Sequence, residues 1–131
     1  VMTEDQRIDD FISRHNWKMN ATGTGLRFVI YRHGNGPKAE IGQVARFNYS
    51  LVLLNGDTIS TSSESGPMEF MIGQGGVENG LEEGILLLKK GDRAKLIIPS
   101  HLAFGLVGDM DKIPAKATLV YDIELIDLIK N

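Results

Sequence analysis

The stretch that decides the fold reads Ala45-Arg46-Phe47-Asn48-Tyr49-Ser50-Leu51-Val52-Leu53-Leu54-Asn55-Gly56. Apolar residues occupy alternate positions from Ala45 to Leu53, and the residues between them are mostly polar. This period of two is typical of a strand that buries one face. The Asn55-Gly56 pair predicts a tight hairpin turn, because both residues tolerate positive φ. The stretch therefore predicts a long strand that folds back into an antiparallel sheet.

Similar short alternating runs outside this stretch predict the remaining strands. They cover residues 26–32, 68–72, 94–98 and 117–125. A short helix is expected over residues 77–90, and a long loop over residues 102–114. Gly80 and Gly84 each cost the helix roughly 1 kcal/mol, which is tolerable if it packs very close to a sheet. The pattern predicts an α+β domain with about five antiparallel strands and one short helix.

The N-terminal residues follow a different period. Thr3 and Gln6 form a capping-box pattern at the start of a helix expected over residues 3–16. This helix has one narrow apolar stripe, made of Ile8, Phe11 and Ile12. Two Gly and two Thr within residues 20–25 indicate a linker. We expect residues 1–24 to be a helical extension and linker, and residues 25–131 the main domain. The stripe is expected to pack on that domain or on a second copy.

Composition excludes several classes of function. The net charge is −3 with both signs interleaved, which argues against a nucleic-acid footprint or a polybasic membrane patch. The sequence has no Cys, so thiolate catalysis and disulfides are excluded. Apolar runs such as residues 85–88 are far shorter than a membrane span. The three His are isolated in sequence, and no metal site is expected.

Four strings of the sequence together indicate a family. They are residues 77–84 (Val-Glu-Asn-Gly-Leu-Glu-Glu-Gly), residues 90–99 (Lys-Gly-Asp-Arg-Ala-Lys-Leu-Ile-Ile-Pro), Ala103-Phe104-Gly105, and residues 113–125 (Ile-Pro-Ala-Lys-Ala-Thr-Leu-Val-Tyr-Asp-Ile-Glu-Leu). In this order and spacing, the chain resembles the FKBP family of peptidyl-prolyl cis-trans isomerases over about residues 26–128. The resemblance implies an FKBP-like sheet wrapped on one short helix.

The resemblance also implies an activity, which is isomerisation of X–Pro bonds in folding proteins. Rotation about the amide crosses a barrier of roughly 18–20 kcal/mol, because resonance is lost in the twisted state. Such an enzyme needs no nucleophile, metal or cofactor, only a pocket that binds the twisted amide better than the planar one. The implied partners are proline-containing polypeptides. A macrolide is a further implied ligand, with weakened affinity.

Carried over residue by residue, the resemblance implies a catalytic set and a substrate-binding set. The catalytic set is Tyr49, Ser60, Phe104 and Tyr121. The substrate-binding set is Ile59, Met68, Phe70, Val77, Glu78, Leu81 and Ile113. Ser60 stands where the family has Asp, and Phe104 where it has Tyr, so we expect a reduced rate. Glu78 stands where a family Ile offers its main-chain N–H.

Other readings remain open at this level. Plain core packing explains the same apolar positions from alternation alone. The chain is alternatively a catalytically weak FKBP-fold chaperone or peptide-binding module, or an adaptor that forms a homodimer through the N-terminal helix. Because the chain starts at Val1 and its first residues are polar, we expect a bacterial exported protein, periplasmic or lipoprotein-anchored. A cytoplasmic location stays possible.

Overall fold

The computed structural model describes residues 1–105 and 107–130. Leu106, within the loop expected over residues 102–114, and Asn131, at the end of the expected domain, lie outside the described residues. The strands are β1 (Asn20–Ala21), β2 (Arg27–Arg32), β3 (Gln43–Leu53), β4 (Thr58–Thr61), β5 (Met68–Met71), β6 (Arg93–Ile98) and β7 (Leu119–Lys130). The helices are α1 (Glu4–Arg14), α2 (Ser62–Ser65), α3 (Asn79–Ile85) and the short 3-10 turn η1 (Ser100–Leu102).

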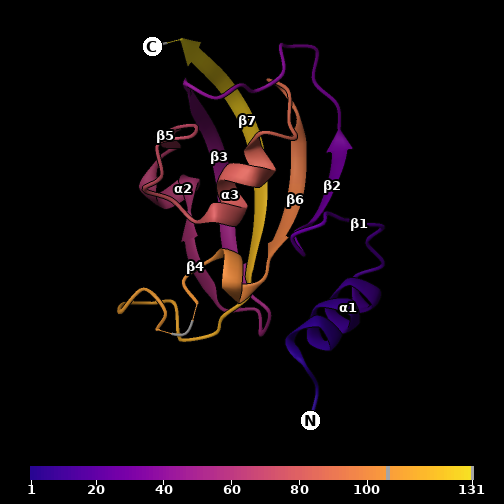
Figure 1. Cartoon of the computed structure of the whole chain (residues 1–131). Coiled ribbons are helices and arrows are strands. Elements are labelled where there is room, and N and C mark those ends of the chain that lie inside the picture. The colour runs from indigo at the N-terminus through magenta and orange to yellow at the C-terminus, as the bar shows by residue number, and fades with distance from the viewer. Residues whose placement is uncertain (106, 131) are drawn as a thin grey trace.

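Within the described residues, the strands form one antiparallel sheet in the order β1-β2-β6-β7-β3-β4, with β5 paired to β3 (Figure 1). The long strand predicted from the alternating stretch is β3, which pairs with β7 from Gln43 opposite Lys130 to Leu53 opposite Leu119. At its end, Gly56 adopts a φ of 94° and donates its N–H to the Leu53 carbonyl at 2.9 Å. The expected α+β class and the hairpin are confirmed.

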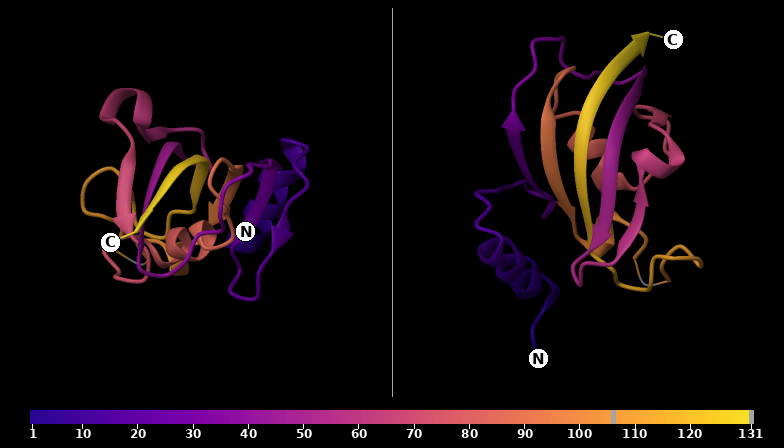
Figure 2. Two further views of the ribbon diagram at one scale, coloured as in Figure 1. Left: turned by 90° about the horizontal axis from the view of Figure 1, so that it is seen from above. Right: turned by 180° about the vertical axis from the view of Figure 1, so that it is seen from behind.

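The two faces of the sheet are covered differently. Side chains of β6 alternate, so Leu96 and Ile98 join the main core beneath α3, whereas Ile97 points to the other side. Figure 1 shows α3 in front of β7, and the rear view in Figure 2 shows β7 in front of α3. The main core therefore lies between α3 and the concave face of the sheet, which is the side that carries the candidate site.

The second helix is shorter than predicted, because it covers Asn79–Ile85 and not residues 77–90. Beyond it the backbone changes partners: Ala39 donates to the Leu88 carbonyl, and Lys90 donates to the Pro37 carbonyl, both at 2.9 Å. The glycines inside α3 meet the sheet as expected. A Cβ on Gly80 would lie 2.5 Å from Ile98, so a larger residue cannot fit without movement.

The N-terminal helix lies on the outer face of the sheet, and its capping box is formed as predicted. Ile8 is fully buried and Phe11 is 5% exposed, and both pack with Ile97 of β6 and Val120 of β7. The apolar stripe is therefore covered by the chain's own sheet. The expected linker contains β1, which pairs with β2. In the part of the chain that the structure describes, no helix is long and apolar enough to cross a membrane.

Candidate functional site

A concavity of about 490 Å³ opens on the α3 side of the sheet. It lies where the turn before α3, the segment after η1, and strands β5 and β7 meet. The described lining residues are Met68, Gly76, Val77, Glu78, Asn79, Ala103, Phe104 and Tyr121. Most of these side chains are apolar, and Glu78 is the one charged residue among them.

Tyr121 comes from the inward face of β7 and is 1% exposed. Its hydroxyl donates a hydrogen bond to Glu78 Oε1 at 3.0 Å. Burial, and after it the negative charge of Glu78, raises the pKa of the Tyr121 hydroxyl far above its ordinary value. The phenol is therefore a neutral donor that is already engaged with Glu78.

A row of aromatic rings runs through the core next to the concavity. The ring centroids of Tyr121 and Tyr49 are 6.3 Å apart, those of Tyr49 and Phe47 are 6.1 Å apart, and those of Phe47 and Phe70 are 6.0 Å apart. The Tyr49 hydroxyl and Ser60 Oγ form a hydrogen bond of 2.7 Å. This contact fixes Ser60 against Tyr49 and fixes the Tyr49 ring beside Tyr121.

The backbone at Glu78 is held at the mouth of the site. Its carbonyl accepts the N–H groups of Leu81 and Glu82 at the start of α3. The Glu82 carboxylate in turn accepts the N–H groups of Gly73 and Gly75, at 3.1 and 3.2 Å, and so closes the preceding turn. No described residue accepts a hydrogen bond from the Glu78 N–H, so this donor is available to a ligand.

Phe104 is held on the opposite side of the concavity by the backbone around it. The Ser100 carbonyl accepts hydrogen bonds from the Ala103 N–H at 3.0 Å and from the Gly105 N–H at 2.9 Å. These two amides flank Phe104 in the chain. Farther along the same loop, Asp109 Oδ1 accepts the Ile113 N–H at 2.7 Å.

Five of the residues assigned from the sequence line the concavity together: Met68, Val77, Glu78, Phe104 and Tyr121. The other six are not in its lining. Phe70, Leu81 and Ile113 are buried in the main core, Tyr49 and Ser60 pair with each other, and Ile59 is partly buried against the core.

Three lining residues were not assigned from the sequence: Gly76, Asn79 and Ala103. Each is the chain neighbour of an assigned residue, and that adjacency is the signal that could have found them. Among residues 1–105 and 107–130, no three His, Cys, Asp or Glu side chains cluster in a way that could hold a metal ion.

A family model described as FKBP-type peptidyl-prolyl cis-trans isomerase matches residues 36–126, and the chain belongs to this family. FK506-binding protein 2 of Dictyostelium discoideum is 41% identical over 92 residues, which are 70% of this chain and 69% of that protein. FK506-binding protein 1A of Neurospora crassa is 35% identical over 106 residues, 79% of this chain and 88% of that protein.

Among solved structures, FkpA from Escherichia coli matches with a TM-score of 0.85 at 31% identity. The match covers 97% of this chain and 59% of the FkpA chain, so it extends well beyond the residues matched by the family model. The chain also spans less than half the length of several curated relatives. Its relatives include bacterial and eukaryotic proteins.

Proposed function

We propose that this chain catalyses cis-trans isomerisation of X–Pro bonds in polypeptides at the concavity beside Tyr121. One observation carries the proposal, namely that apolar side chains and an unpartnered backbone donor meet in one concavity. Val77 and Phe104 supply apolar walls, and the Glu78 N–H is free at the edge. These are the two elements that binding a prolyl ring and its neighbouring carbonyl requires.

The chemistry follows from what happens to the amide as it twists. The planar amide is stabilised by resonance, and the twisted form is less polar, so an apolar hollow favours the twisted form relative to water. A hydrogen bond from the Glu78 N–H to a substrate carbonyl would hold one end of the peptide while the prolyl end rotates. No covalent bond is made or broken, so the step needs no nucleophile.

The second candidate is a peptide-binding module with little turnover, acting as a chaperone. The engagement of the Tyr121 hydroxyl favours it, because this hydroxyl lines the concavity and already donates to Glu78. It can donate to a substrate carbonyl only if it gives up Glu78. The residues that we propose as catalytic are Tyr49, Ser60, Phe104 and Tyr121, and as substrate-binding Ile59, Met68, Phe70, Val77, Glu78, Leu81 and Ile113.

Proline-limited refolding separates the two candidates. The full chain at micromolar concentration is added to a protein whose refolding waits for an X–Pro bond, and the slow phase is timed. An enzyme shortens the slow phase in proportion to its concentration. A binding module leaves the slow rate constant unchanged while it suppresses aggregation, and that result would exclude the isomerase proposal.

The match to FkpA over nearly the whole chain supports residues 1–24 as an extension docked on an isomerase domain of residues 25–131. Two relatives are named for binding FK506, which supports weak macrolide binding by this chain. A homodimer through α1 is the less favoured arrangement, since Ile8 and Phe11 are already covered. The mass of the full chain in solution tests the dimer.

We propose a bacterial, exported setting, periplasmic or membrane-anchored. The likeness to FkpA from E. coli supports it, and a cytoplasmic setting is the alternative. Immunodetection in periplasmic, membrane and cytoplasmic fractions of the source cell decides between these settings. A signal confined to the cytoplasmic fraction would refute the exported setting.

A further inference from the structure

The loop between β6 and β7 forms one wall of the candidate site. The chain leaves β6 at Ile98 and returns as β7 at Leu119, and these two residues are paired across the strands. The intervening loop supplies Ala103 and Phe104 to the concavity. Both ends of the loop are therefore neighbours at one end of the sheet, and whatever holds them together controls where Phe104 lies.

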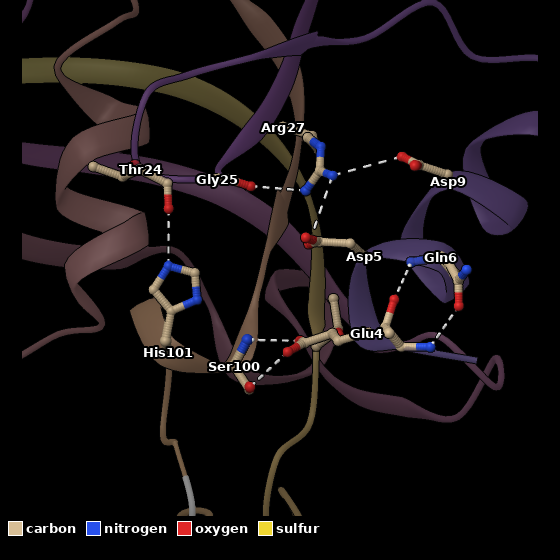
Figure 3. Close-up of polar contacts among 11 residues, drawn as sticks. Glu4, Asp5, Gln6, Asp9, Thr24, Gly25, Arg27, Ser100 and His101 are labelled. Atoms are coloured by element: carbon tan, nitrogen blue, oxygen red, sulfur yellow. Dashed lines mark hydrogen bonds and ion pairs between the residues drawn. The ribbon is translucent and has the colours of Figure 1, made fainter. Parts of the chain in front are cut away.

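Glu4, at the start of α1, holds both ends of this loop. Its carboxylate accepts the Ser100 N–H at 2.7 Å and the Ser100 hydroxyl at 2.7 Å (Figure 3). It also accepts the hydroxyl of Thr118 at 2.5 Å. Thr118 is 4% exposed, so this third contact is shielded from water. Hydrogen bonds to an ionised acceptor are about twice as strong as neutral ones.

Ser100 passes this constraint to the site. Its carbonyl accepts the N–H groups of Ala103 and Gly105, which lie on either side of Phe104. The path from Glu4 to Phe104 thus consists of two hydrogen bonds between Glu4 and Ser100, two hydrogen bonds to the Ser100 carbonyl, and the peptide bonds that join Ala103 and Gly105 to Phe104. The next residue in the turn, His101, is also tied to the N-terminal segment, through a 2.8 Å contact of Nε2 with the Thr24 carbonyl (Figure 3).

The rest of α1 is held without Glu4. Ile8 and Phe11 are buried against the sheet. Arg27 of β2 forms ion pairs with Asp5 at 3.8 Å and with Asp9 at 3.5 Å (Figure 3). A change at Glu4 alone would therefore remove its own contacts with the loop while the helix stays in place.

We infer that Glu4 is a positioning residue of the isomerase site, which fixes Phe104 against the concavity through Ser100 and Thr118. The inference rests on the proposed function. It gives α1 a role in the reaction, although the helix contributes no lining residue to the concavity. The helix and the concavity lie on opposite faces of the sheet, and the loop between β6 and β7 connects them.

The test compares Glu4→Gln with the control Asp9→Asn, which removes a charge from the same helix but has no contact with the loop. The full chain is assayed on an X–Pro peptide, and amide exchange is followed at Ala103 and Gly105 and within β7. We expect Glu4→Gln to lower kcat/KM about tenfold, within the roughly hundredfold that a 1 Å misplacement can cost. Exchange should accelerate at Ala103 and Gly105 and stay unchanged within β7.

A double-mutant cycle separates positioning from general stability. If Glu4 acts through Ser100, the change Ser100→Ala should lower kcat/KM in the wild-type chain and add little in the Glu4→Gln chain. Thr118→Val, which keeps the side-chain shape, should cause a smaller loss in the same direction. It also serves as the test if Glu4→Gln does not fold.

Two results would overturn the inference. One is wild-type kcat/KM and wild-type exchange in Glu4→Gln. The other is an equal loss in Asp9→Asn and Glu4→Gln, which would indicate a general helix contact. If the wild-type chain has no isomerase activity, the proposed function fails instead. Amide exchange and peptide affinity then still show whether Glu4 holds Phe104.

Discussion

The Tyr121 hydroxyl donates its hydrogen bond to Glu78, and the two lining residues come from different elements, Tyr121 from β7 and Glu78 from the start of α3. The bond joins the buried ring of Tyr121 to the one charged residue of the described lining. It also places a carboxylate next to the backbone N–H that is proposed to hold the substrate. The behaviour of this pair in variants is therefore the most direct probe of the site.

Tyr121→Phe removes the hydroxyl and keeps the buried ring. Because the hydroxyl is engaged with Glu78, we expect peptide affinity and kcat to change by less than about threefold. The free energy of unfolding should fall by about 0.5–1.5 kcal/mol, which is the usual net value of one hydrogen bond. Peptide titration, isomerisation kinetics and urea unfolding measure these quantities. A large fall in kcat at unchanged affinity would instead assign the hydroxyl to the twisted amide.

Glu78 should give the site a preference among substrates. A carboxylate in the lining attracts a cationic residue beside proline, at a value of about 0.2–1 kcal/mol for an exposed pair. We expect Lys-Pro peptides to have a higher kcat/KM than Glu-Pro peptides, with the ratio falling in high salt. Glu78→Gln should remove most of this preference. An unchanged ratio in Glu78→Gln would show that the carboxylate does not face the substrate.

Gly80→Ala should destabilise the fold, although alanine favours helices by about 1 kcal/mol over glycine. The added Cβ would lie 2.5 Å from Ile98 Cγ2 and 3.2 Å from Leu102 Cβ. Ile98 is fully buried and branched at Cβ, so it cannot turn away. We expect a net loss of about 1–3 kcal/mol in urea unfolding.

Gly23→Ala is the matched control for Gly80→Ala, because no atom lies within 4 Å of its added Cβ. It should leave the free energy of unfolding within about 0.5 kcal/mol of wild type. Equal stability of both variants would mean that α3 can move away from the sheet.

The loss of folding stability at acidic pH should depend on Glu4. Burial by itself raises the pKa of Glu4, but the hydrogen bonds from Thr118 and Ser100 and the charge of Arg7 outweigh it, so the net pKa lies below the ordinary value of 4.5. A carboxyl with a lowered folded pKa contributes stability that is complete above its ordinary value. That stability is lost as pH falls through the folded pKa.

Urea midpoints of the wild-type chain and of Glu4→Gln should therefore differ most above pH 4.5 and converge below it. Parallel curves throughout the acid range would show that the ionisation of Glu4 is not coupled to folding.

Local patterns predicted much of the fold. Asn55-Gly56 predicted the hairpin, Thr3 and Gln6 predicted the helix start, and the helical glycines predicted close packing on the sheet. The end of α3 was not predictable in this way. It depends on pairing of Lys89 with Lys38, a contact between residues far apart in sequence.

The candidate site, too, was predictable from the sequence only in part. The resemblance to a family identified Met68, Val77, Glu78, Phe104 and Tyr121, and these line one concavity. No local pattern connects Glu4 with Ser100 and Thr118, because the partners are separated by 96 and 114 positions. A Glu at the first turn of a helix already has a sufficient local explanation in the helix dipole, so nothing in the sequence marks it for a second role.

The position of β7 determines when the sheet can be completed during synthesis. The last strand along the chain is inserted between β3 and β6, so those two strands have no partner for one edge until it arrives. During synthesis, a chain that has emerged only as far as β6 would expose unpaired backbone on both strands, a template for aggregation. The same strand carries Tyr121, so the sheet and the candidate site are completed in the same step.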